Sequence, residues 1–207
     1  ELIKKCCEKY SIDYVFIDMN PGLSAINQTF FAYADAIIVP ANPDPFSTMA
    51  LKTLKQILPK WKKWAIQGRE IFKESSYPLP NCEMKFVGEI IQRFNLRNHK
   101  AAKPYTGKIS EIKTYIETEF VSELEKYDMV YDISVLIEKG VLKDHCLGEI
   151  PEFGALIQKA NESMLPVFEL TKEDMGTVGN VYDSMEEKRK LFDEMYENII
   201  NVIMELV

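Results

Sequence analysis

Residues 14–47 constrain the fold of this chain more than any other stretch. The stretch opens with an apolar run rich in aromatic and β-branched residues, which predicts a strand buried on both faces. A turn, an amphipathic helix and a second apolar run closed by a proline follow it. In order, these four segments are residues 14–17, 20–22, 24–34 and 36–39. Strand, helix and strand in this order predict a right-handed parallel crossover.

Asp18 directly follows the first apolar run. An unpaired carboxylate is costly inside a buried strand, but the cost disappears at the end of the strand. In an open parallel sheet, the carboxyl ends of the strands are also where ligands bind. We therefore expect Asp18 at the rim of a binding crevice. The alternative is an acid that only faces solvent or caps a turn.

The pattern continues along the chain. Residues 85–92 and 145–150 predict a third and a fourth strand, and a long helix fits residues 47–65, with Ser47 as its cap and Pro59 near its end or at a kink. Further helices are expected at residues 109–139 and 153–161. A loop is expected at residues 171–183, before a last helix that opens with a capping box at Ser184 and Glu187.

The order of these motifs resembles the second half of the ParA/MinD-type ATPases, which are P-loop proteins with a deviant Walker A loop. The motifs are a strand ending in Asp, a turn with Pro, a helix ending "AD", the strand "AIIVP", and "FS…AL..L". "CLGEIPE" from Cys146 and "LPVFEL" at 165–170 extend the resemblance. It implies one α/β domain over residues 1–207, with a mostly parallel sheet flanked by helices on both faces in three layers. Residues 60–85 would be a helical and loop elaboration.

The resemblance also implies a nucleotide site. Asp18 would be the Walker B acid, which holds Mg²⁺ through water, and the turn after it would be a nucleotide-sensing switch. Gln92 and Arg93 would hold the adenine base, and the loop at Pro151 and Glu152 would line its pocket through backbone groups. The switch residues are Asn20, Pro21 and Gly22. Asn20, Gly22 and Gln92 depart from the family's usual residues, and an ordinary turn is the alternative for 20–22.

The phosphate-binding loop of the family, KGGxGK[ST], is absent from this sequence. Gly-Lys occurs only at Gly107-Lys108, without the other glycines or the Ser/Thr. Only 17 residues precede Asp18, and the first residue is Glu1 rather than Met. We expect these residues to be the C-terminal portion of a longer ATPase, whose phosphate-binding Lys and water-positioning acid lie upstream. No catalytic residue is assigned within the 207 residues.

The implied activity is that of an ATP-dependent switch in plasmid or chromosome partitioning. The intact protein would bind ATP and Mg²⁺, dimerise around the nucleotide, hydrolyse it slowly, and work with a ParB-like partner and nonspecific DNA. The basic residues between 93 and 108 are the candidates for DNA contact, namely Arg97, Lys100, Lys103 and Lys108. This segment could instead touch the nucleotide, or be a solvated loop.

Other functions remain open from the sequence. One is a noncatalytic partner-binding module on the same scaffold. Another is a relative such as an iron-protein reductase or a biotin-pathway ligase, although no cysteine pair is placed for the reductase's shared cluster. Trp61 and Trp64 are expected in the core, with a partner surface as the alternative.

Composition sets further bounds on the class of protein. Hydrophobic residues make up 46% and charged residues 28% of the chain, which is ordinary for a globular protein. No apolar run approaches the ~20 residues of a membrane helix. Four cysteines without ligand spacing and two histidines make a zinc site improbable, and we expect a reduced, cytoplasmic protein. The net charge of −7 means that any DNA contact must come from a local basic patch.

Overall fold

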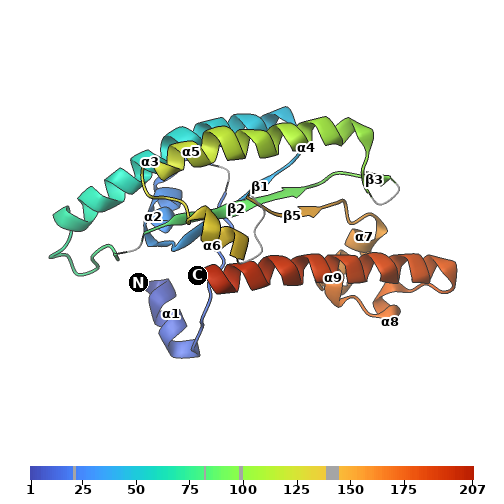
Figure 1. Ribbon diagram of the computed structural model, residues 1–207. Coiled ribbons are helices and arrows are strands. Elements are labelled where there is room, and N and C mark those ends of the chain that lie inside the picture. Colours follow the sequence, from blue (N-terminus) through green and yellow to red (C-terminus); the bar gives the residue numbers. More distant parts are fainter. Residues whose placement is uncertain (21, 82, 98–99, 139–144) are drawn as a thin grey trace.

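The centre of the molecule is a three-stranded parallel sheet with the order β1-β2-β5 (Figure 1). The computed structural model describes residues 1–20, 22–81, 83–97, 100–138 and 145–207. The strands are β1 (Ala36–Ala41), β2 (Lys85–Gln92) and β5 (Cys146–Ile150). The predicted α/β class and parallel sheet are confirmed, and β2 has the predicted bounds.

Helices cover both faces of the sheet (Figure 1). On one face lie α3 (Pro45–Ile71), α4 (Lys103–Tyr115) and α5 (Val121–Glu125), and on the other lie α7 (Ala155–Ser163) and α9 (Asn180–Leu206). Two apolar clusters correspond to the two faces. Phe86 and Ile91 of β2 join the cluster under α3 and α4, whereas Ile90 packs with the cluster under α9. The central strand therefore packs against the helices of both layers.

Several shorter elements complete the described chain. They are α1 (Leu2–Tyr10), α2 (Ala25–Tyr33), β3 (Leu96–Arg97), β4 (Lys100–Ala101), the π-helix η1 (Ile116–Phe120), α6 (Ile133–Glu138), the 3₁₀ turn η2 (Val167–Glu169) and α8 (Lys172–Met175). β3 and β4 form an antiparallel hairpin. None of the helices in these ranges combines the length and apolar character needed to cross a membrane.

The strand predicted at residues 14–17 is wrong. Residues 12–20 run without a turn or bend and pair with no strand of the described chain, and residues 14–17 are 39–66% exposed. An apolar run becomes a buried strand only where a neighbouring strand offers a free edge and helices cover both faces. In the structure this run lies in no sheet and its side chains are not covered by helices on both sides.

The start of α3 also differs from the prediction. The helix begins two residues before Ser47, and its cap is Asp44, whose carboxylate accepts the Ser47 N–H at 2.8 Å. The Ser47 hydroxyl accepts the Asn42 N–H instead, at 2.8 Å. Pro59 lies buried inside α3, and the helix continues to Ile71 because packing on the sheet outweighs the lost backbone hydrogen bond.

The C-terminal helices begin elsewhere than predicted. α9 starts at Asn180, so Ser184 and Glu187 lie within the helix and form no capping box. A capping box occurs instead at Thr171 and Asp174, which open α8 inside the predicted loop. In place of the predicted helix at 109–139, α4, η1 and α5 run without a break from Lys103 to Glu125, residues 126–132 are not helical, and α6 follows; residue 139 lies outside the described residues. Trp61 is partly buried in the core as expected, whereas Trp64 is 36% exposed.

Candidate functional site at the carboxyl edge of the sheet

The ends of β2 and β5 bring four predicted site residues together. Gln92 pairs with Ile150 in the sheet, and the Arg93 N–H donates to the Ile150 carbonyl at 3.2 Å. One step further, the Glu152 N–H donates to the Phe94 carbonyl at 2.9 Å. Gln92 and Arg93 are therefore fixed beside Pro151 and Glu152 by backbone hydrogen bonds beyond the ends of the strands.

The four side chains present different chemistry at this edge. Gln92 is half-buried, Arg93 and Glu152 are exposed, and Pro151 is buried. A half-buried amide can donate to and accept from the edge of a heterocycle, and an exposed guanidinium can bind an anion. This arrangement could bind a small polar ligand, and neither side chain is placed for nucleophilic chemistry.

Arg93 has a left-handed backbone, with φ at 61°. The next residue, Phe94, is 1% exposed and belongs to the core, so the chain must turn sharply between strand and core. Left-handed geometry is unfavourable for residues with a Cβ, and such outliers cluster at ligand sites. The sequence carries no signal for this conformation, because Gly or Asn would be the usual residue there.

The proposed switch turn is held by a residue that the sequence analysis did not identify. Asn27 of α2 is 3% exposed, and its Nδ2 donates to the carbonyls of Asn20 and Gly22 at 2.8 and 2.5 Å. The Gly22 N–H donates to the Asn20 Oδ1 at 3.0 Å, and Pro21 lies outside the described residues. A polar residue beside Ile26 on a predicted apolar helix was the available signal.

Asp18 lies exposed on the irregular segment before this turn. In the described chain, no hydrogen bond or ion pair joins residues 18–20 or Gly22 to the four residues at the carboxyl edge. The described residues also contain no group of three or more His, Cys, Asp or Glu that could hold a metal ion. Asp18 is therefore a single carboxylate, which could contact Mg²⁺ only together with water and ligand oxygens.

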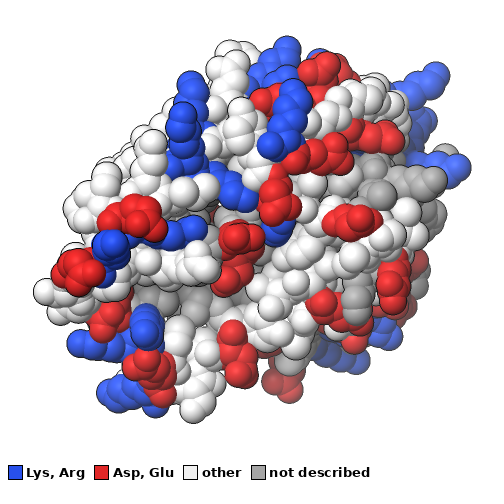
Figure 2. Space-filling view, turned by 60° about the vertical axis from the view of Figure 1, so that its left-hand side comes forward, with Lys and Arg blue, Asp and Glu red and all other residues white. Residues whose placement is uncertain are grey.

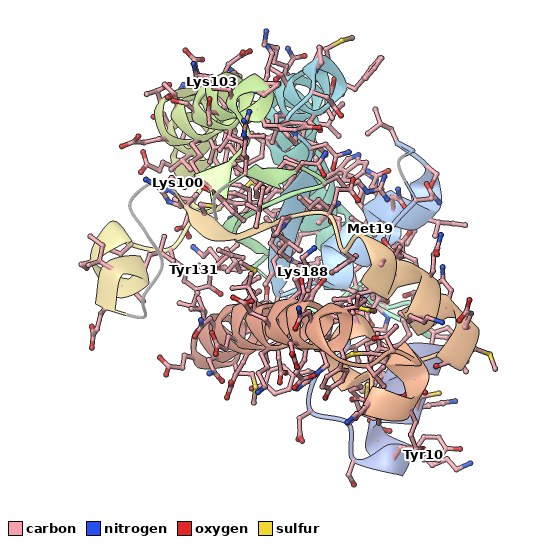
Figure 3. The ribbon with its side chains drawn as sticks, turned by 90° about the vertical axis from the view of Figure 1, so that its right-hand side faces the viewer. Tyr10, Met19, Lys100, Lys103, Tyr131 and Lys188 are labelled. Atoms are coloured by element: carbon pink, nitrogen blue, oxygen red, sulfur yellow. The ribbon has the colours of Figure 1, made fainter. Side chains whose placement is uncertain are left out.

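The basic residues proposed for DNA contact lie on the β3–β4 hairpin and on α4. Lys100 and Lys103 are well separated from Met19, next to Asp18, in Figure 3. Lys108 pairs with Glu111 at 2.6 Å, which reduces its value as a phosphate contact. Acidic and basic side chains are intermixed on the face that Figure 2 shows. Arg97, Lys100 and Lys103 are thus the stronger part of the predicted set.

A surface hollow of about 470 Å³ lies elsewhere, at the junction of α3, α4 and η1. Its residues are Lys52, Lys55, Gln56, Tyr115 and Glu119. The hydrogen bond of Lys55 to Glu119, at 2.9 Å, raises the pKa of the lysine and lowers that of the carboxyl group. Because these two charges neutralise each other, the exposed Lys52 is the remaining charge among the residues given for this hollow.

Comparison with known proteins does not assign the chain to a family. Functional argument therefore rests on the geometry of its own residues. No protein-family model, curated protein or solved structure matches the chain.

Proposed function

We propose that the chain is part of a ParA-like ATP-dependent molecular switch, with the three-layer architecture of P-loop proteins and a role in plasmid or chromosome partitioning. The observation that supports this most directly is the cluster at the carboxyl edge. There Gln92, Arg93, Pro151 and Glu152 meet beyond two parallel strands. Ligands of open parallel sheets bind at this edge.

Each residue has a role in this proposal. The Gln92 amide holds the adenine edge, Arg93 borders the base, and the backbone at Pro151 and Glu152 closes the pocket. Asp18 contacts Mg²⁺ through water, and the turn at 20–22 responds to the γ-phosphate. The partners are a second copy, a ParB-like protein and nonspecific DNA. Arg97, Lys100 and Lys103 contact the DNA, and Lys108 contributes less because it pairs with Glu111.

A specific observation favours a second candidate, a noncatalytic partner-binding module. Gly107-Lys108, the only Gly-Lys of the sequence, lies inside α4. The N–H groups of a helix interior bond to their own helix and cannot cradle phosphates. The first proposal therefore assigns the phosphate-binding loop to sequence upstream of Glu1, whereas the second proposal needs no such loop.

The two candidates are separated by ATP·Mg²⁺ binding, measured by calorimetry on the complete gene product and on the 207-residue chain. In the complete product we expect Gln92→Ala to weaken binding about tenfold, the value of one or two lost hydrogen bonds. Gln67→Ala on the exposed side of α3 is the matched control and should leave affinity unchanged.

Hydrolysis provides the second measurement. Asp18→Ala should abolish Mg²⁺-dependent ATP hydrolysis by the complete product, while Asp13→Ala, five residues earlier, should not. Absence of ATP binding by every protein tested would reject the switch and leave the partner-binding module. Binding that Gln92→Ala and Asp18→Ala leave unchanged would reject the proposed site.

A further inference from the structure

Asn27 is a buried amide in the first turn of α2. Ser24 caps this helix, and its Oγ accepts the Asn27 N–H at 3.3 Å. Side chains of a helix lean toward its N-terminus, so the Asn27 side chain reaches the turn at residues 20–22, and the residue is only 3% exposed. Because burial of an amide is costly without hydrogen bonds, the partners of Asn27 define its role.

Three oxygen atoms of the turn surround the Asn27 Nδ2. They are the carbonyl oxygens of Asn20 and Gly22, at 2.8 and 2.5 Å, and the Asn20 Oδ1, at 3.2 Å. The Nδ2 carries two hydrogens, and all three oxygens are acceptors. The orientation of the Asn27 amide is therefore fixed, because the reverse orientation would place its oxygen against three others. A carboxylate of the same shape would be repelled by all three.

These hydrogen bonds connect the turn to the core of the molecule. Among the described residues, no other hydrogen bond or ion pair joins residues 18–20 or Gly22 to another part of the chain. The hydrogen bond from the Gly22 N–H to the Asn20 Oδ1, at 3.0 Å, lies within the turn. α2 itself is anchored, since Phe31 belongs to the buried core cluster. Asn27 thus links an anchored helix to an exposed turn.

We propose that Asn27 is the positioning residue of this turn. It holds residues 20–22 in one arrangement, and through them it fixes where the chain leaves Asp18. Because one side chain supplies these hydrogen bonds, they break together, and their loss sets the free energy that a ligand must provide to move the turn. The connection itself follows from the geometry. Its part in nucleotide response rests on the function proposed above, in which the turn senses the γ-phosphate.

Amide hydrogen exchange in the 207-residue chain tests the connection. Asn27→Asp keeps the shape of the side chain and places an acid where a helix favours one, but an ionised carboxylate cannot donate. We expect the Gly22 N–H to exchange about tenfold faster in this variant, and the Phe31 N–H to be unchanged because α2 stays folded. Gln28→Glu is the matched control. It adds the same charge one residue later, keeps the Asn27 amide, and should leave both exchange rates unchanged.

Asn27→Ala removes the donor without adding a charge. It should also accelerate exchange of the Gly22 N–H, and it decides the question if Asn27→Asp exposes the Phe31 N–H as well. Exchange at Gly22 that neither substitution accelerates would overturn the proposal. Acceleration by Asn27→Asp alone would show repulsion by a new charge rather than the loss of a connection, and would overturn it too.

ATP hydrolysis by the complete product tests the positioning role. In Asn27→Asp a loosened turn should lower kcat about tenfold, while the KM for ATP changes by less than about twofold because Gln92 and Arg93 are untouched. An unchanged kcat, or an equal loss in Gln28→Glu, would reject the positioning of Asp18. If the unsubstituted product neither binds nor hydrolyses ATP, the function proposed above fails, whereas the exchange rates still decide whether Asn27 holds the turn.

Discussion

Arg93 holds a backbone conformation that glycine would adopt more easily. A left-handed residue with a Cβ costs about 1–2 kcal/mol, and the greater freedom of unfolded glycine offsets part of the gain on replacement. We therefore expect Arg93→Gly to change the free energy of unfolding by about 0 to +1 kcal/mol. In the complete product the same substitution should weaken ATP binding, because it removes the side chain at the base pocket.

Ser11 provides the control for this prediction. Its φ is 52°, and it follows α1, far from the carboxyl edge. Ser11→Gly should give a similar change in urea unfolding and no change in ATP affinity measured by calorimetry. A loss of stability in Arg93→Gly, or unchanged ATP affinity, would show that the strained conformation does not serve the site.

Asp128 makes a pH-dependent contribution at the residue scale. Its carboxylate accepts from the Lys85 Nζ at 2.6 Å, and this hydrogen bond, with the charges of Lys85 and Lys62, holds its pKa below the usual range. A depressed folded-state pKa stabilises the fold above the unfolded value of about 4, and the contribution is lost as pH falls through the folded value. Because the Asp128 side chain is 74% exposed, we expect less than about 1 kcal/mol.

Asp128→Asn tests this contribution, since Asn tolerates the φ of 52° at this position. The difference in unfolding free energy between the variant and the parent should be largest near pH 7 and shrink below about pH 4. Asp13→Asn, whose carboxylate makes no ion pair within the described chain, is the matched substitution for comparison. A difference that stays constant with pH would contradict the assignment.

At the scale of elements, two similar apolar runs differ in structure, because residues 85–92 form a strand and residues 14–17 do not. β2 was predicted residue for residue because strands on both sides and helices on both faces match its continuous apolar pattern. Residues 14–17 carry the same pattern but lack a strand partner. The apolar pattern measures how well a segment suits a sheet, and it contains no information on whether the rest of the chain places the segment beside another strand.

The candidate site likewise combines features that the sequence predicts with features that it does not. The adjacency of Gln92 and Pro151 was predictable, since the ends of parallel strands meet at one edge. The left-handed Arg93 was not, because it depends on how the chain turns from the strand into the core. Asn27 stands out in the sequence only as a polar residue on an apolar helix, which does not show that it holds the turn. The placement of Asp18 at that edge stays a prediction.

The two tryptophans of α3 give a prediction for an element. Trp61 packs edge-on against Phe31, with ring centroids 5.5 Å apart, while Trp64 is 36% exposed. Trp61→Ala should cost about 2–4 kcal/mol, somewhat less than for a fully buried ring, and Trp64→Ala less than about 1 kcal/mol. Chemical unfolding of both variants is the measurement. Equal small losses would instead favour the partner-surface interpretation for this pair.

At the scale of the whole molecule, two cores meet at one thin sheet, and glycines allow the close approach. A Cβ on Gly148 of β5 would lie 2.8 Å from Cδ1 of Ile199, so α9 sits almost against the backbone of the sheet. The candidate site lies at the edge where these layers end. The order of the elements along the chain predicts which layers pack together. The distance between the layers depends on the glycines at these positions, which have no side chain.

Gly88 in the central strand allows a test of how closely the strands must approach each other. A Cβ there would lie 2.4 Å from the His145 carbonyl oxygen and 2.9 Å from Cγ of Leu147, and the backbone oxygen cannot rotate away as a side chain would. Gly88→Ala must therefore shift β2 against β5, and we expect a loss of about 2–3 kcal/mol in unfolding free energy. Gly107→Ala, inside α4 with no atom within 4 Å of the new Cβ, should gain about 0.5–1 kcal/mol in unfolding free energy.

Urea unfolding of the two variants compares the same chemical change in two places, and a Gly88→Ala protein as stable as the parent would show that the strands can separate without cost. Because Gln92 and Pro151 are held by the same β2–β5 pairing, a measurable loss in Gly88→Ala should be accompanied by faster amide exchange at Arg93 and Glu152.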